Sequence, residues 1–262
     1  GKLITDRLRV QSFKVYGDGA LGSRGACLLK PYHDKPDQSG FLLSHPAHFD
    51  SVARWAFEHE WQLCTHAIGD SGNRVILNTY GKYLPKRNDL RWRIEHAQVV
   101  NPYDRVLFRQ FKVIPSVQPT HATSDMYWAE KRLGPERIQH AYAYQPLLEQ
   151  NGWMPLGTDF PVEDISPMKT FYSATVRKDA MGWPEKGFLP EYALSREQAL
   201  RGMTLWAAKG SFEEKSKGSL EKGKWADFIV LNQDLMQVPE SSILSTTILS
   251  TYIQGRPVYR RK

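Results

Sequence analysis

The sequence has few cysteines and no long apolar run. Only Cys27 and Cys64 occur among 262 residues, and they form neither a disulfide framework nor a paired zinc-ligand motif. The apolar stretches are short and broken by charge, well below the roughly 18 residues that a membrane-spanning helix needs. The opening segment also lacks the apolar core of a signal peptide. We therefore expect packing cysteines and no membrane partner. The compartment stays open, with a cytoplasmic location weakly favoured by the few cysteines and by the opening segment.

A concentrated positive charge is missing as well. The net charge is +7 and the pI is near 9.3, but lysine and arginine are spread along the chain, with short clusters only at 215–224 and 260–262. Diffuse basicity without a nucleic-acid-binding motif indicates a solvated surface, so we expect no nucleic-acid partner. The length and a hydrophobic content of 41% suit one large domain, alone or with a small appendage.

The sequence does contain a series of chemically useful side chains, each at the end of an apolar run: Lys14, His66, His96 and Asp159. His66 and His96 are 30 residues apart, the length of one strand–helix unit in an eight-unit barrel. His96 and Asp159 are separated by 63 residues, about two such units, and the apolar segment 113–117 lies between them. Strand ends in such a barrel open into one mouth, so these side chains can share one ion.

Strand and helix patterns alternate as such a barrel requires. Apolar runs predict strands at residues 10–16, 62–65, 90–95 and 113–117. Apolar spacing and N-cap signals predict helices over 49–57 and 75–83, from Asn101-Pro102, from Ser166-Pro167, and over 199–208 behind a Ser195/Gln198 capping box. Short strands at 226–231, 248–254 and 257–260 predict a small β appendage. The glycine- and proline-rich loop 17–46 is long enough for an active-site lid.

Each of these side chains also has an ordinary alternative role. A strand-end histidine such as His66 or His96 is often a hydrogen-bonded core residue, although Asp70 and Glu95 lie near enough in sequence to hold an imidazole for metal binding. Asp159 can instead cap a helix. A lysine inside an apolar strand pays a desolvation cost unless its pKa falls or its amine is modified, so Lys14 is either a carboxylated, metal-bridging lysine or one whose amine reaches water.

The segment Gly17–Gly22 offers a competing function. It fits G-x-G-x-x-G directly after a strand, the fingerprint of dinucleotide-binding folds. The fingerprint requires a helix to follow, whereas Pro31 would end any such helix early. A nicotinamide-dinucleotide-binding module remains an alternative on this pattern.

Five motifs together carry a family resemblance. FKVYGDGALGSRGA, THAIGD, IEHAQ, PSVQPTH and GTDFPVE follow one another in this order, and the chain ends with GSLEKGKWADFIVL and TILSTYIQGRPVYR. The series resembles the second half of the barrel in the amidohydrolase superfamily, in particular the family 3 branch, which includes N-substituted formamide deformylases. The end of the chain is similar to the small β-sandwich of those enzymes.

The resemblance implies an α/β fold, the C-terminal part of a (β/α)8 TIM barrel from about strand four to strand eight. The barrel part would occupy residues 1–212 and part of the β-sandwich residues 213–262. Lys14 would lie on strand four as the carboxylated lysine, His66 and His96 on strands five and six as metal ligands, and Asp159 on strand eight as metal ligand and proton acceptor. The implied cofactor is a divalent metal, with zinc as the expected ion, in one or two copies, or in none where the fragment lacks part of the ligand set.

One departure concerns the metal site. Members of the superfamily carry a His-x-His pair on strand one, and none occurs in this sequence. The chain therefore reads as a C-terminal fragment, which we expect to be inactive alone and to form an open half-barrel or one completed by another chain, with a homo-oligomer as an alternative. A non-catalytic, partner-binding fragment is the third interpretation.

The resemblance also implies a reaction. Metal-activated water would hydrolyse a carbon–nitrogen bond of a small amide-type substrate, and Asp159 would transfer the proton to the leaving nitrogen. The candidate substrate contacts are Tyr32, Arg93, Gln98, Gln118 and His121.

Overall fold

The computed structural model describes residues 2–5, 8–85 and 88–262. The chain divides into two compact units. The first unit comprises Gly1–Val117 and Asp125–Gly152, and the second comprises Gln118–Ser124 and Trp153–Lys262. The predicted boundary at residue 212 falls inside the second unit, and the division into barrel and sandwich domains stays a prediction.

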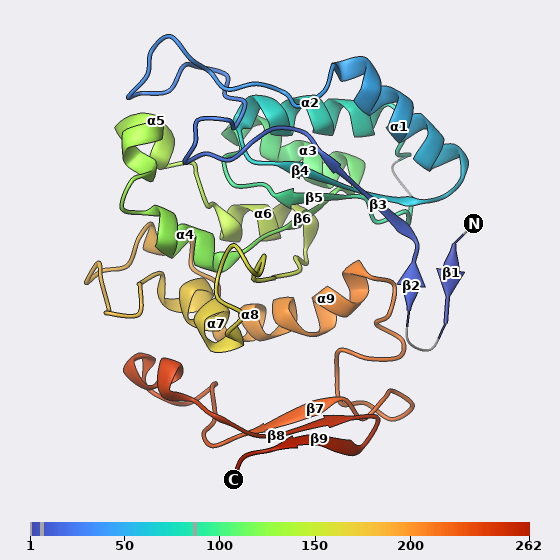
Figure 1. The fold of residues 1–262 in the computed structure, drawn as a ribbon, viewed down its shortest axis with the longest axis vertical. Helices are drawn as coiled ribbons and strands as arrows, with labels where there is room; N and C mark the ends of the chain where they lie inside the picture. The colour runs from blue at the N-terminus through green and yellow to red at the C-terminus, as the bar shows by residue number, and fades with distance from the viewer. Residues whose placement is uncertain (1, 6–7, 86–87) are drawn as a thin grey trace. The chain divides into compact units, whose positions relative to one another are not determined.

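The first unit is built on a parallel sheet. Its strands, in spatial order, are β3 (Ser12–Tyr16), β4 (Gln62–Ala67), β5 (Arg93–His96) and β6 (Ile114–Ser116). The connections run through α1 (Pro46–Glu58), α2 (Asp70–Gly81) and η1 with α3 (Pro102–Asp104 and Arg105–Phe111), which lie along one face of the sheet (Figure 1). These elements confirm the predicted alternation of strands and helices in an α/β fold.

The helices form where apolar spacing and caps coincide. In α1, Phe49, Ala53 and Ala56 recur at helical spacing and are buried, while the His45 side chain accepts a hydrogen bond at the N-terminus. Asn101 caps the η1 turn through its side chain, with proline in the first helical position. The start at Asn101-Pro102 was predicted from these residue types, whereas the helix predicted over 49–57 begins earlier, at Pro46.

The strand register determines which polar side chains lie beside one another on the sheet. Cross-strand neighbours in register share a face. One row on that face contains Lys14, Cys64 and Arg93, and the next contains Tyr16, His66 and Glu95. Because β3 is an edge strand, Lys14 and Tyr16 are exposed although they lie beside buried residues.

Other parts of the first unit lack a strong periodic signal. A short hairpin of β1 (Leu3–Ile4) and β2 (Arg9–Val10) precedes the sheet, and α5 (Ala129–Ile138) and α6 (Tyr144–Asn151) follow it. Helix α5 contains Gly134 with a φ of +78° and Pro135, so its amino-acid pattern indicates a turn rather than a helix.

The long loop 17–46 is anchored to α5. Arg137 donates to the carbonyls of Lys30 and Pro31, at 2.9 and 2.7 Å, and Arg132 donates to Gly22. Asp34 forms ion pairs with both Arg132 and Arg24. These contacts tie the loop to α5, and its role as an active-site lid stays a prediction.

We expect Asp34→Ala to weaken this anchor. Hydrogen bonds from Arg24 and Arg132 hold the pKa of Asp34 below its usual value, so the carboxylate stabilises the fold above its unfolded pKa and loses this effect as the pH falls. At pH 7 the free energy of unfolding of the variant should be about 1 kcal/mol or less below that of wild type, the usual contribution of surface ion pairs. In acid the difference should be small. Urea unfolding at pH 7 and at pH 3 measures the free energy of unfolding under the two conditions, and Asp37→Ala is the control. Equal losses at the two pH values would contradict the prediction.

The second unit combines helices with an antiparallel sheet. Its elements are α4 (Pro119–Asp125, whose last residue belongs to the first unit), α7 (Pro167–Val176), η2 (Pro190–Tyr192), α8 (Arg196–Met203), α9 (Leu205–Gly210), β7 (Phe228–Leu231), η3 (Glu240–Ser245), β8 (Ile248–Ile253) and β9 (Arg256–Arg260). The strands pair in the order β7-β8-β9, close to their predicted positions. The predicted Ser195/Gln198 capping box opens α8, but Thr204 (φ −123°, ψ −90°) divides the predicted helix into two.

The segment before Asp159 differs from the expected eighth barrel strand. Within the described residues, 153–158 form no strand, and Leu156 makes only an isolated bridge. Pro155 and Gly157 flank Leu156, and the Leu156 N–H donates to the carbonyl of Gly202 at 3.0 Å. The parallel sheet of the described chain has the four strands β3, β4, β5 and β6.

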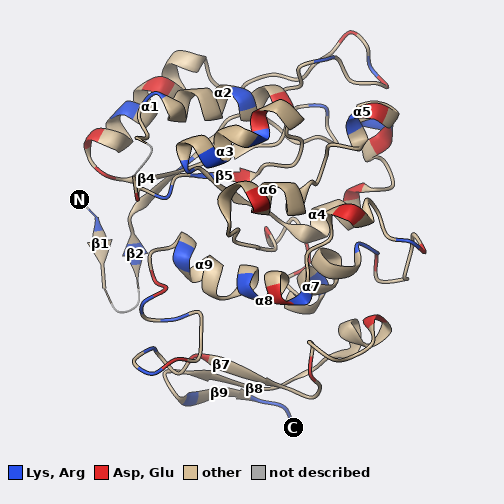
Figure 2. Cartoon of the chain, turned by 180° about the vertical axis from the view of Figure 1, so that it is seen from behind, with Lys and Arg blue, Asp and Glu red and all other residues tan. Residues whose placement is uncertain are grey.

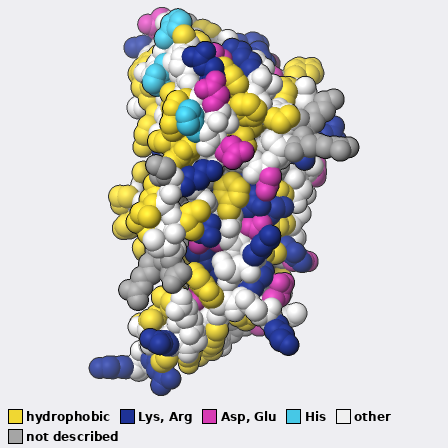
Figure 3. All heavy atoms as spheres, turned by 90° about the vertical axis from the view of Figure 1, so that its right-hand side faces the viewer, with side chains coloured by type: hydrophobic (Ala, Val, Ile, Leu, Met, Phe, Trp, Pro, Cys, Tyr) yellow, Lys and Arg dark blue, Asp and Glu magenta, His cyan; other side chains and the backbone are white. Residues whose placement is uncertain are grey.

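The surface carries charges of both signs. Lysine and arginine are interspersed with aspartate and glutamate along the helices of both units (Figure 2). On the face shown in Figure 3, exposed histidines and charged side chains lie among hydrophobic ones. Among the described helices, none combines the length and apolar character needed to cross a bilayer.

Candidate metal and catalytic site

His66 lies at the carboxyl end of β4, in a buried position held by oxygen atoms. Its Nε2 is 3.4 Å from Asp18 Oδ1 and 3.5 Å from the carbonyl oxygen of Gly19. The Asp18 side chain is fully buried and accepts hydrogen bonds from the backbone N–H groups of Ile68, Gly69 and Cys27 at 2.8–2.9 Å. The imidazole is therefore oriented by a carboxylate that the backbone itself fixes.

His96 lies beside His66 at the end of the neighbouring strand. The two ring centroids are 4.6 Å apart with the planes tilted by 70°, and both residues are less than a tenth exposed. The backbone of His96 has a φ of +76°, a conformation that costs energy for a side chain with a Cβ and recurs at functional sites. It turns the chain out of β5 immediately after the predicted ligand.

Lys14 is exposed on β3, with its Nζ 5.3 Å from the Tyr16 ring centroid. Lys14 stands on an edge strand of the described sheet, so its exposure matches the predicted alternative in which the amine reaches water. The register places it beside Cys64, one row away from His66. Burial raises the pKa of the Cys64 thiol to about 12, so this cysteine is a packing residue, as predicted.

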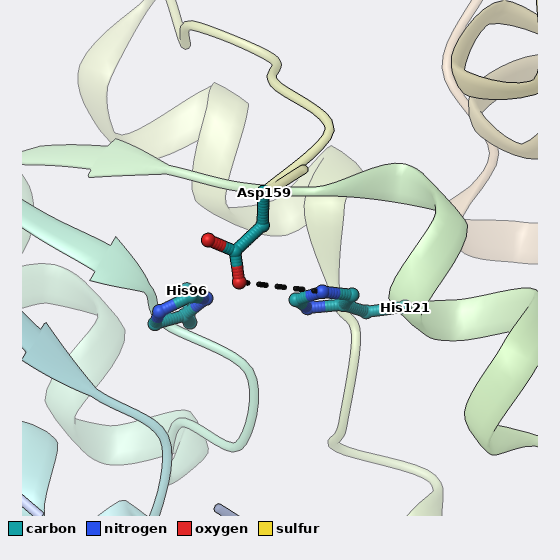
Figure 4. Close-up of side chains that lie close together, drawn as sticks. All are labelled: His96, His121 and Asp159. Atoms are coloured by element: carbon teal, nitrogen blue, oxygen red, sulfur yellow. Dashed lines mark ion pairs between the residues drawn. The ribbon is translucent and has the colours of Figure 1, made fainter. Parts of the chain in front are cut away.

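Asp159 faces His121 within the second unit. Figure 4 shows the His121 imidazole directed at the Asp159 carboxylate, with 3.7 Å between Nε2 and Oδ2, and also labels His96 at the end of β5. Glu163 Oε1 lies 4.0 Å from the same His121 nitrogen and accepts a 2.5 Å hydrogen bond from Ser124. Asp159 has a φ of +59°. One imidazole is thus placed between two carboxylates.

Two predicted substrate contacts, Tyr32 and Gln98, form hydrogen bonds within the fold, and their contact with substrate stays a prediction. The Tyr32 side chain is 1% exposed, and its hydroxyl donates to the carbonyl of Ala26 at 2.7 Å inside the long loop. Burial raises the pKa of Tyr32 well above its usual value. Gln98 is buried and donates to Asp125 and Tyr142, both at 2.9 Å. These contacts indicate residues that support the fold.

The other predicted substrate contacts are placed as follows. Arg93 lies in the same face row as Cys64 and donates to Glu95 at 2.7 Å, so its charge is balanced inside the sheet. Gln118 is buried immediately before α4, and His121 is buried within it. Their role as substrate contacts stays a prediction.

The Gly17–Gly22 segment does not open a helix. Residues 21–24 form a turn, and the next helix in this described stretch begins at Pro46. Dinucleotide binding needs the helix N-terminus to face the pyrophosphate. The motif instead supplies Asp18 and the Gly19 carbonyl, which face His66.

Two acidic residues near the predicted ligands, Asp18 and Glu163, were not predicted as part of the site. Asp18 precedes the turn at Ile68 by 50 residues, so no local period connects them. Glu163 falls within the quoted motif GTDFPVE, and its acidic side chain four residues after Asp159 was the available signal.

The available donors fit a divalent metal. Zinc is bound by imidazole nitrogen and carboxylate oxygen, with nitrogen ligands at about 2.0–2.1 Å. The first unit offers two adjacent, buried imidazoles, and the second offers an imidazole–carboxylate pair. Oxygen atoms around His66 Nε2 provide the outer support that metal-binding histidines generally have.

Comparisons with known proteins agree with this chemistry. The chain is 33% identical over 262 residues to protein LONG AFTER FAR-RED 3 of Arabidopsis thaliana, covering 99% of this chain and 44% of that protein. It is 24% identical over 204 residues to N-substituted formamide deformylase of Arthrobacter pascens, covering 76% of this chain and 36% of that enzyme. The chain spans less than half the length of these curated relatives.

A solved structure is also similar. An uncharacterized metal-dependent hydrolase from Pyrococcus horikoshii OT3 matches with a TM-score of 0.81 and 32% identity, over 92% of this chain and 48% of that one. The model of the amidohydrolase family matches residues 2–259. On this near-complete match, together with the motif series and the shared fold, the chain belongs to the amidohydrolase family.

Proposed function

We propose that this protein is a metal-dependent hydrolase that cleaves carbon–nitrogen bonds in small amide-type substrates. The observation that carries the proposal is the pair of buried imidazoles, His66 and His96, at the carboxyl ends of adjacent parallel strands. Side chains at this end of parallel strands form the active sites of barrel enzymes. The formamide deformylase among the relatives supports a carbon–nitrogen bond as the target.

The proposed ligands are Lys14, His66, His96 and Asp159. When bound, a divalent metal such as zinc, as one ion or two, lowers the pKa of water and polarises a carbonyl group. The exposed amine of Lys14 is accessible to carbon dioxide, which its proposed carboxylation requires. A barrel completed beyond the four parallel strands, with a β-sandwich appended, is the proposed architecture of the assembled enzyme.

Asp159 is the proposed proton acceptor. Its side chain is 38% exposed, so its carboxylate is open to water and substrate. It would take the proton of the attacking water and return it to the nitrogen that leaves. His121, 3.7 Å away and held also by Glu163, would stabilise the carboxylate and the charge that develops on the substrate oxygen.

We expect the purified chain to bind zinc, and His66→Ala/His96→Ala to abolish this binding. Alanine removes both nitrogen donors of the first unit and leaves the carboxylates, which bind zinc weakly alone. Elemental analysis after zinc loading and desalting should give near one ion per wild-type chain and close to none in the double variant. His45→Ala/His48→Ala is the matched control, since both histidines are exposed near the start of α1. Equal zinc in all three proteins would refute the ligand assignment.

The activity is tested in a complete barrel. Because the chain covers 48% of the Pyrococcus horikoshii hydrolase, it is fused to the part of that protein it does not match, and is also assayed alone. We expect zinc-dependent release of amine from N-substituted formamides by the fusion and not by the chain alone. Zinc binding without hydrolysis of any amide by the fusion would contradict the proposed reaction.

A further inference from the structure

We infer that Asp18 is a positioning residue that fixes the tautomer of His66 and thereby makes Nδ1 its metal-binding atom. The inference rests on the proposed function, since it assigns a role toward the metal. It is carried by the burial of Asp18, its hydrogen bonds and the two oxygen atoms that face His66 Nε2.

The environment of His66 Nε2 consists of acceptors. A carbonyl oxygen cannot donate a hydrogen bond, so the Gly19 carbonyl 3.5 Å away favours a proton on Nε2. Asp18 Oδ1, at 3.4 Å, favours the same tautomer. A neutral imidazole with its proton on Nε2 presents a lone pair on Nδ1, and only a nitrogen with a free lone pair can bind a metal.

The Asp18 carboxylate is held in place beside His66 by hydrogen bonds from the backbone. Its Oδ2 accepts from Gly69 at 2.8 Å and from Cys27 at 2.9 Å, and its Oδ1 accepts from Ile68 at 2.9 Å. A Cβ on Gly72 would stand 2.5 Å from Oδ2, so the carboxylate fills the available space. Three backbone N–H groups on two segments therefore determine where its oxygen atoms lie.

The arrangement links strand ends that form the metal site. Asp18 follows β3, while Ile68 and Gly69 follow the end of β4 at Ala67, the residue after His66. The same carboxylate therefore ties the loops after two adjacent strands and orients the imidazole between them. A mutation at Asp18 should change the affinity for metal without removing any ligand.

The test combines nitrogen NMR with zinc titration. In the metal-free wild-type chain at pH 8, ¹⁵N spectra should show a protonated Nε2 and an unprotonated Nδ1 for His66, whose signals are those missing from His66→Ala. Zinc should shift the Nδ1 signal. In Asp18→Asn the amide nitrogen must face either the backbone donors or His66, so the tautomer should become mixed and zinc affinity should fall by about 10–100-fold.

Asp70→Asn is the matched control. Asp70 is also a buried carboxylate that accepts from loop N–H groups, those of Leu29 and Ser71, but no contact joins it to His66. In this control the tautomer of His66 should be unchanged, and the zinc affinity should stay within about threefold of wild type. A larger loss is expected only for a residue that orients a metal ligand.

The outcomes separate the two proposals. A proton on His66 Nδ1 in the wild type, or an equal loss of zinc affinity in Asp18→Asn and Asp70→Asn, would overturn the positioning role. The wild-type spectrum decides the tautomer even where Asp18→Asn does not fold. Absence of zinc binding by a wild type with protonated Nε2 would instead refute the metal-dependent function.

Discussion

Replacing Asp159 with asparagine in the fused barrel is expected to lower the turnover of N-substituted formamides by about 10³-fold, within the range for loss of a proton-transferring group. Asparagine has the same shape but cannot take a proton from water or return it to the leaving nitrogen. The loss should appear in kcat, while KM changes little, because the substrate is bound by other groups. Steady-state kinetics on zinc-loaded protein measures both constants.

The matched control for this variant is Asp164→Asn. Asp164 lies on the same segment, and its carboxylate forms an ion pair with Lys169 at 2.6 Å rather than with His121. We expect wild-type turnover in this control. A turnover in Asp159→Asn within threefold of wild type would exclude Asp159 as the proton acceptor, and a loss of bound zinc in that variant would assign it mainly as a ligand.

A methyl group at Gly69 is expected to destabilise the first unit by about 3 kcal/mol, the upper part of the range for overpacking a filled site. Its Cβ would stand 2.1 Å from the carbonyl oxygen of Cys27. That carbonyl also accepts from the N–H groups of Ser71 and Gly72, so displacing it breaks the start of α2. The backbone of Gly69 has an ordinary φ of −76°, and the effect is therefore steric.

Urea unfolding of Gly69→Ala measures this loss, with Gly157→Ala as the control. A Cβ on Gly157 would meet no heavy atom within 4 Å, so its stability should stay within about 0.5 kcal/mol of wild type. The midpoint should shift without a change in the m-value. Similar midpoints for the two variants would contradict the prediction. They would show that the Cys27 carbonyl moves away from the added methyl group at little energetic cost.

Much of the fold was predictable because its signals are local. The Ser195 capping box and the Asn101-Pro102 start depend on residues within three or four positions, and both form as predicted. Apolar runs likewise located the strands of the sheet. Helix α5 and the division of the predicted helix at Thr204 were not predictable, since tertiary packing overrides weak local preferences there.

The site was predictable in part for the same reason. His66 and His96 stand at strand ends one barrel unit apart, and parallel pairing brings their rings to 4.6 Å. The roles expected for Tyr32 and Gln98 stay predictions, because the sequence does not show which hydrogen-bond partners a polar side chain meets. Both side chains are occupied inside the fold.

The sequence by itself determined the family, the order of strands and helices, and the residue types available for metal chemistry, because each follows from composition, spacing or a motif read along the chain. Only the tertiary structure decided that Lys14 is exposed on an edge strand, that Asp159 follows an irregular segment, and that Asp18 orients His66. These properties depend on contacts between residues about 50 or more positions apart and on which strands have neighbours in the sheet. No local pattern in the sequence encodes such long-range contacts or strand neighbours.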